Sequence, residues 1–145
     1  MKMSRTVAYA VQATLQLAQA PQNTPTPCSR LASEGHMPER FLLQILRNLV
    51  THGILQSTRG VDGGYRLERR PEEISLLEVI EAIDGPLTPS IPASDGLPAD
   101  SQDRLQSALE LVTTTAREQL GAIKLSELMC PLSVASEPTL EASLS

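Results

Sequence analysis

Residues 38–67, PERFLLQILRNLVTHGILQSTRGVDGGYRL, decide the fold because they join an amphipathic segment to a glycine-rich turn. Apolar residues recur at helical spacing over residues 38–52, and the proline at the start and the glycine just after are typical helix boundaries. Two short strands are expected next, over residues 54–58 and 64–68, with RGVDGG between them. The stretch therefore predicts a helix followed by a β-hairpin that carries Arg59 at its tip.

The two faces of the predicted 38–52 helix differ in chemistry. One half of the helical wheel is apolar and suits a core: Phe41, Leu42, Ile45, Leu46, Leu49 and Val50. The opposite side is a polar, net positive stripe: Arg40, Gln44, Arg47 and Thr51, flanked by Leu43 and Asn48. Such a stripe on an isolated helix is usually a solvated face, so its meaning depends on the elements around it.

Two further helices are expected upstream of this one. Residues 4–20 have an apolar face at helical spacing. Thr26 can cap a short helix over residues 28–34, with a proline at its first position and Gly35 as its end. Three helices and a glycine-rich hairpin, in that order, predict a mainly α fold with a small two-stranded wing, a winged helix-turn-helix.

The chain downstream of the hairpin predicts more helix and one irregular loop. Residues 75–84 begin with the capping box SLLE and end before a glycine, which predicts a helix. Residues 86–100 contain four prolines and cannot form regular helix or interior strand. A long helix is expected over residues 101–122, a short one over 125–128, and a frayed polar tail over 131–145.

Composition fits one globular domain, and charge alone does not decide whether its partner is a polyanion. The 145 residues are 41% apolar, 20% charged and only 2% aromatic, and 22 of them are leucine. This favours helix packing and disfavours base stacking on aromatic platforms. The net charge of −5 is uneven, since residues 1–73 carry +3 and residues 74–145 carry −8. The division suits a first half that meets a polyanion, although +3 over so many residues also fits random scatter.

Several classes of protein are excluded by what the sequence lacks. Cys28 and Cys130 are too few and too far apart for a disulfide framework or a zinc ribbon. No apolar run approaches the roughly 18 residues of a membrane helix, and glutamines interrupt the stretch that imitates a signal peptide. We therefore expect a cytoplasmic protein with no membrane partner. No motif of a hydrolase, metalloprotease or nucleotide-binding loop is present, so we expect no catalytic residues and no enzyme activity.

Helix, hairpin and basic half together favour DNA as the partner. The third helix can enter the major groove, where arginine pairs with guanine and glutamine with adenine. Arg59 would then lie over the backbone or in the adjacent minor groove. Arg5, Lys2 and the start of the second helix could hold phosphates.

Residues 37–87 resemble the Rrf-two family of bacterial winged-helix regulators, which includes the IscR, NsrR and CymR types. The resemblance rests on the strings L-x-Q-I-L-R-x-L, RG…GGYRL and PEEISLLEVIEAIDG and covers about residues 1–88. The helix over residues 101–122 agrees in position and character. The resemblance implies a homodimer formed by this long helix, a palindromic operator bound by two wings, and action as a repressor.

The resemblance also implies a domain division and a set of site residues. The domains are the DNA-binding winged helix-turn-helix over 1–85, the loop over 86–100, the dimerisation helix and short helix over 101–130, and the tail over 131–145. The DNA-binding candidates are Arg5, Thr26, Ser29, Pro38, Arg40, Phe41, Gln44, Arg47, Arg59, Gly60 and Tyr65. The dimerisation candidates are Leu105, Leu109, Val112, Ala116 and Leu120, with Ala108 and Leu111 on an adjoining strip.

The effector is where this chain departs from the family. Cluster-binding members carry three cysteines in the loop before the dimer helix, whereas residues 86–100 contain none. Because an iron–sulfur centre takes about four soft ligands, we expect no cofactor and no metal site. Control by a small molecule, by a partner protein or by no effector stays open. So do two alternatives: a module that binds another protein, as CymR-type relatives do, and a redox- or metal-responsive regulator that uses Cys28 or Cys130.

Overall fold

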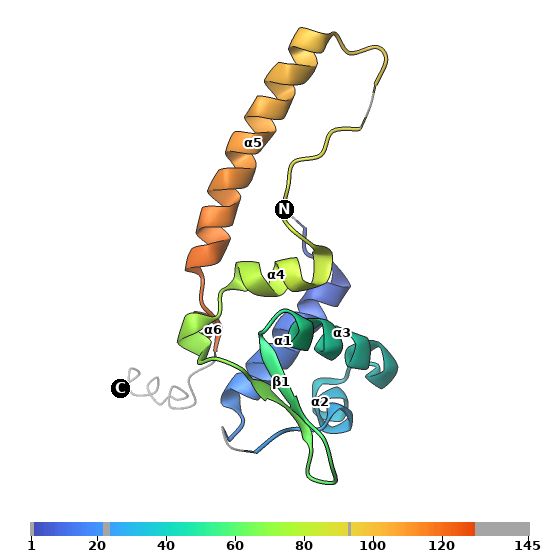
Figure 1. Cartoon of the computed structure of the whole chain (residues 1–145), viewed down its shortest axis with the longest axis vertical. Helices are drawn as coiled ribbons and strands as arrows, with labels where there is room; N and C mark the ends of the chain where they lie inside the picture. Colours follow the sequence, from blue (N-terminus) through green and yellow to red (C-terminus); the bar gives the residue numbers. More distant parts are fainter. Residues whose placement is uncertain (1, 22–23, 93, 130–145) are drawn as a thin grey trace, which may run out of the picture.

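A computed structural model describes residues 2–21, 24–92 and 94–129, which form six α-helices, one 3₁₀ helix and a two-stranded sheet. In chain order these are α1 (Arg5–Gln19), α2 (Cys28–Gly35), α3 (Glu39–Thr51), β1 (Leu55–Thr58), β2 (Gly64–Leu67), η1 (Pro71–Glu73), α4 (Leu76–Asp84), α5 (Ala99–Ala122) and α6 (Leu125–Leu128). In Figure 1 the first four α-helices pack together with the hairpin, and α5 extends away from them. The predicted fold class is confirmed. The predicted frayed tail and Cys130 lie outside the described residues.

The core is aliphatic and lies where α1, α3 and α4 meet. The innermost residues of α3 are fully buried: Leu42, Ile45, Leu46 and Leu49. Burial of one such side chain contributes about 1.5–3 kcal/mol, so this face fixes the rotation of α3. Phe41 and Val50, predicted for the same face, lie at its edge, where Phe41 is exposed and Val50 half-buried.

The hairpin is an antiparallel pair of strands that contacts the backbone just before α2. Leu55 pairs with Leu67, and Thr58 pairs with Gly64. On the edge of β2 that does not pair with β1, the backbone of Thr26 exchanges two hydrogen bonds with Tyr65, with N···O distances of 2.9 and 2.8 Å. The prediction that Thr26 caps α2 is therefore wrong, since its backbone and buried side chain belong to this bridge and Pro27 takes the cap position.

The end of α2 also differs from the prediction. Gly35 lies inside the helix, and His36 takes the left-handed conformation that ends it, with φ of 55° and ψ of 47°. A Cβ atom on Gly35 would lie 2.6 Å from Nε2 of Gln12 and 2.7 Å from Cε of Met37. Gly35 thus favours the close packing of these two side chains against α2, and its φ is not positive. Because both atoms are the far ends of flexible side chains, they could shift to admit a Cβ atom.

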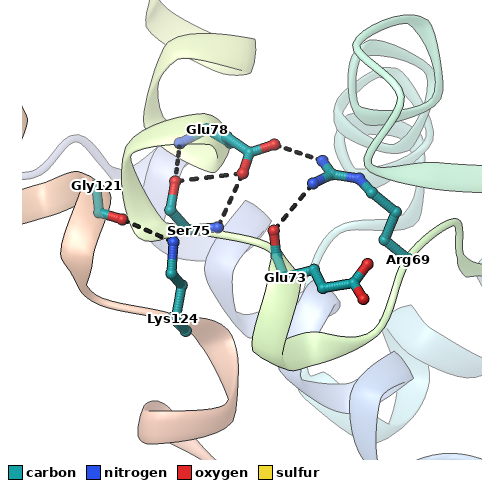
Figure 2. A network of polar contacts seen from close by, with 6 residues as sticks. All are labelled: Arg69, Glu73, Ser75, Glu78, Gly121 and Lys124. Carbon is teal, nitrogen blue, oxygen red and sulfur yellow. Dashed lines mark hydrogen bonds and ion pairs between the residues drawn. The ribbon is translucent and has the colours of Figure 1, made fainter.

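The capping box at the start of α4 is confirmed, and it belongs to a larger polar network (Figure 2). Oγ of Ser75 accepts a hydrogen bond from the Glu78 N–H, and the Glu78 carboxylate accepts one from the Ser75 N–H. The same carboxylate forms an ion pair with Arg69, whose guanidinium also donates to the Glu73 carbonyl at 2.9 Å. The network therefore ties the segment after the wing to the first turn of α4.

The end of α5 is fastened to α4 by backbone and side chain. Residues 74–76 and 123–125 form a short bridge in which Leu76 N–H donates to Ile123 O at 2.8 Å and Leu125 N–H donates to Ile74 O at 2.9 Å. Arg117 of α5 forms an ion pair with Glu81 of α4. The position of α5 is thereby fixed relative to the helices that surround the core.

Most of α5 itself makes no contact with the core. In this 24-residue helix only Leu120 is buried, at 9% exposure. Val112 is 63% exposed and Leu111 is 70% exposed, while Leu109 and Ala116 are half-buried. Leu120 thus differs from the other four predicted dimerisation residues, because its own protomer already covers it. Across the described residues, no helix has the length and hydropathy needed to span a bilayer.

Candidate nucleic-acid interface

The polar stripe of α3 faces outward. Arg40, Gln44, Arg47 and Thr51 are all exposed, as expected when the opposite face enters the core. Gln44 Nε2 approaches Asn48 Oδ1 at 3.4 Å, and Thr51 Oγ donates to the Arg47 carbonyl at 3.0 Å. Within the described part of the chain, no carboxylate pairs with either arginine of the stripe. The stripe therefore presents unneutralised positive charge and amide groups to the outside.

The wing tip presents Arg59 on a turn that only glycine allows. Arg59 and Gly60 are exposed, and Gly60 has a φ of 109°. A Cβ atom on Gly63 would lie 2.2 Å from the Thr58 carbonyl oxygen. The tight turn thus depends on close backbone contact at Gly63 and on positive φ at Gly60.

A groove of about 750 Å³ separates α3 from the wing, and it brings several candidates together. Arg47 lines it from α3, and Arg59, Gly60 and Tyr65 line it from the hairpin. Ser57 and Thr58 also line the groove, although they were not among the predicted site residues. The available signal was their position at the end of a strand directly before Arg59.

The other predicted residues lie around this groove or apart from it. Ser29 is exposed in the first turn of α2, and Pro38 is exposed just before α3. Phe41 packs edge-on against Tyr9, with 5.9 Å between ring centroids. Arg5 is exposed in the first turn of α1 and does not line the groove. Thr26 is buried at 8% exposure beneath the hairpin, so its position suits holding the wing.

Cys28 lines the groove as well, but its surroundings disfavour the reactive thiolate. Burial raises the pKa of the Cys28 thiol, and the negative charge of Glu39 raises it further. The thiol lies 3.8 Å from the Glu39 carbonyl, within reach of a weak hydrogen bond. Reactive cysteines depend on a lowered pKa, so these contacts do not support a redox role for Cys28.

Comparison with known proteins identifies the family. Residues 3–131 match the model of the Rrf2 family, described as an iron-dependent transcriptional regulator. The chain belongs to the Rrf2 family. The resemblance drawn from the sequence is confirmed, and the family is one of transcriptional regulators, not of enzymes.

Curated relatives support the assignment. The putative HTH-type regulator Rv1287 of Mycobacterium tuberculosis is 45% identical over 87 residues, which cover 60% of this chain and 54% of the relative. The chain thus spans about half the length of that relative. CymR of Bacillus subtilis is 29% identical over 125 residues, covering 84% of this chain and 91% of CymR.

Solved structures share the fold along most of the chain. CymR of B. subtilis superposes with a TM-score of 0.71 and 26% identity, over 88% of this chain and 95% of that one. IscR of T. potens gives 0.74 and 26% identity, over 99% of this chain and 96% of that one. The winged helix-turn-helix with a long helix after it is therefore the fold of these regulators.

The family description names iron, but the donor residues of this chain do not suit an iron–sulfur cluster. The sequence has two cysteines, and the loop over residues 86–100 has none. In the described residues, no group of three or more histidine, cysteine or acidic side chains could hold a metal ion. Cys28 lies in the groove between α3 and the wing, away from that loop. We therefore ascribe no part of the proposed DNA-binding site to an iron–sulfur cluster.

Proposed function

We propose that this protein is a sequence-specific DNA-binding regulator that acts as a homodimer on a palindromic operator and represses transcription. One observation carries the proposal: the C-terminal end of the exposed α3 stripe and the arginine-tipped wing line a single groove, with Arg47 and Thr51 on one side and Arg59 on the other. Arg40 and Gln44 continue the exposed stripe beyond this groove. In this proposal residues 1–85 contact DNA and residues 101–130 form the dimer.

In the proposed complex α3 lies in the major groove. Gln44 reads adenine through its amide, and Arg40 and Arg47 contact guanine or phosphate oxygens. Arg59 enters the adjacent minor groove, and Arg5 and Ser29 contact the backbone. Thr26 and Tyr65 act by fixing the wing, because their backbones form the bridge beneath it.

The proposed dimer is formed by two copies of α5. Leu105, Leu109, Val112 and Ala116 share one face of that helix, and Leu105 and Val112 are exposed in the protomer. A two-fold arrangement would place the two α3 helices about 34–36 Å apart, one turn of B-DNA. This spacing accounts for a palindromic operator.

The proposal includes a cytoplasmic location and no bound cluster. An anaerobic purification tests the second part, through the visible absorption spectrum and an iron count. A colourless sample without iron is expected, because the chain supplies too few thiolate ligands. A coloured sample that contains iron in proportion to protein would contradict this part of the proposal.

Substitutions on α3 and at the wing tip test DNA binding. Gln44→Ala is expected to weaken operator binding by about 1–3 kcal/mol and to relax preference at one base position. Arg59→Ala is expected to weaken binding to all sequences and to lower the salt slope by about one. Arg104→Ala, an exposed arginine on α5, is the control and leaves binding unchanged. Fluorescence anisotropy on a selected operator, at several salt concentrations, measures all three.

The same experiment distinguishes the alternative. If neither Gln44→Ala nor Arg59→Ala changes DNA affinity, the α3 stripe and the wing tip are not the DNA site. The uncovered face of α5 would then be a surface for another protein, and DNA binding would be secondary.

A further inference from the structure

A second concave site lies at the base of the wing, between β2 and the end of α1. It encloses about 440 Å³, within the range of small-ligand pockets. Its apolar wall consists of Leu17, Ala18, Pro21, Leu67 and Pro71. Its polar side carries three arginines and two glutamates that follow one another closely in the chain: Arg66, Glu68, Arg69, Arg70 and Glu73. The arginines outnumber the carboxylates, so the lining keeps a net positive charge.

The three guanidinium groups differ in what already engages them. Arg66 donates from Nε to the neutral amide oxygen of Gln56 at 2.7 Å, and no carboxylate among the described residues pairs with it. A guanidinium has five N–H donors, so the rest of Arg66 stays available. Arg70 pairs with Glu73 at 3.3 Å, but its side chain is 72% exposed and such a pair is weak. Arg69 is held by Glu78 and the Glu73 carbonyl.

We propose that this cavity binds a small organic carboxylate with a branched apolar body of about the size of a leucine side chain. Its carboxylate would accept two parallel hydrogen bonds from Arg66, an arrangement that guanidinium geometry favours. Its apolar body would lie against Leu17, Ala18 and Leu67. The limited volume favours such a small molecule over a nucleic-acid strand.

The place of the cavity links it to the wing. Arg69 lines the cavity and also belongs to the network that joins the wing to α4 (Figure 2). Tyr65 lines both this cavity and the groove between α3 and the wing. An occupant would therefore contact the strand that presents the wing, and its binding is expected to be visible at residues 65–70.

Titration of the full chain followed by two-dimensional ¹H–¹⁵N NMR tests the proposal. The probe is 4-methylpentanoate, compared with its uncharged amide and with inorganic phosphate. We expect saturable shifts of the amide signals of Ala18 and residues 65–70, with an affinity at least tenfold higher for the carboxylate than for the amide or phosphate. Equal affinity for the amide would show that the arginines do not recognise a carboxylate. Equal affinity for phosphate would show that the apolar wall does not contribute to binding. Either result would contradict the proposal.

Three variants make the test specific to the site. Arg66→Gln removes the proposed partner of the carboxylate, and Ala18→Phe fills the cavity without changing its charge; each is expected to weaken probe binding at least tenfold. Arg59→Gln, at the other end of the hairpin, is the control and leaves it unchanged. Unaltered binding in Ala18→Phe, which keeps all three arginines, would overturn the proposal even if Arg66→Gln failed to fold.

This inference does not depend on the proposed function. Failure of DNA binding would appear as a wild-type protein that does not recognise any operator, whatever the probe does. Failure of the inference would appear as a protein that still binds DNA but shows no saturable shifts when the probe is added.

Discussion

The helices α3 and α5 are both amphipathic, yet the protomer covers the apolar face of only one of them. In α3, a helix of 13 residues, four leucine and isoleucine side chains are fully buried. In α5, a helix of 24 residues, Leu120 alone is buried, while Leu111 and Val112 are largely exposed. Exposed apolar surface on this scale is typical of an interface. The first half of the chain thus covers its apolar residues within one protomer, whereas α5 leaves most of its apolar residues exposed.

The two helices are nevertheless mechanically connected. The bridge between residues 74–76 and 123–125 and the ion pair of Arg117 with Glu81 fasten the end of α5 to α4. In turn α4 packs against α1 and α3 around the core. A partner held on α5 would therefore set the position of the α3 stripe in space, which a regulator with two half-sites requires.

The largest expected effect comes from a charge on the uncovered face of α5. Val112→Asp should convert the proposed dimer to a monomer, because a desolvated carboxylate at an apolar interface is costly. Loss of the second half-site should weaken operator binding on the order of 100-fold or more. Light scattering after gel filtration and anisotropy measure mass and affinity. Thr114→Asp, exposed on the opposite side of α5, is the control; a dimeric Val112→Asp variant would contradict the comparison.

A matched pair of leucine truncations sharpens the same contrast within the protomer. In the Val112→Asp background, Leu46→Ala should lower the free energy of unfolding by about 2–5 kcal/mol, because it opens a cavity in the core. Leu111→Ala should change it by no more than about 0.5 kcal/mol, since that side chain is already in water. Urea denaturation compares them. A similar cost for both would mean that α5 packs on its own protomer in solution.

Features governed by local rules could be predicted from the sequence. The rotation of α3 follows from its helical periodicity, so the outward stripe and the buried leucines were both foreseen. The capping box at Ser75 and the end of α4 at Gly85 depend on residues three or four apart, and the structure has them as predicted. The hairpin likewise follows from its glycines and strand-forming residues.

Features that depend on distant contacts could not be predicted in this way. Gly35 was expected to end α2, but it makes room for Gln12, which lies 23 residues earlier. A Cβ atom on Gly64 would lie 2.4 Å from the Thr26 backbone, a contact that no local pattern reveals. Each of these depends on how elements pack, not on the sequence around the residue.

The smallest expected effect concerns the polar network at the start of α4, where Glu78 contacts both Arg69 and Ser75. Burial alone would raise the pKa of Glu78, but hydrogen bonds from Arg69 and Ser75 outweigh it and hold the pKa below its ordinary value. A carboxylate whose pKa is lowered by folding stabilises the protein above its unfolded pKa, and that contribution disappears as the pH falls through the folded pKa. Glu78→Gln should therefore be less stable than wild type at pH 7, and the difference should shrink below about pH 4.3. Arg69→Gln, which keeps the bonds from Ser75, should give an intermediate profile. Thermal unfolding from pH 3 to 7 measures the difference in stability. If the unfolding temperatures of wild type and Glu78→Gln change with pH in parallel, the Glu78 network contributes no charge-dependent stability.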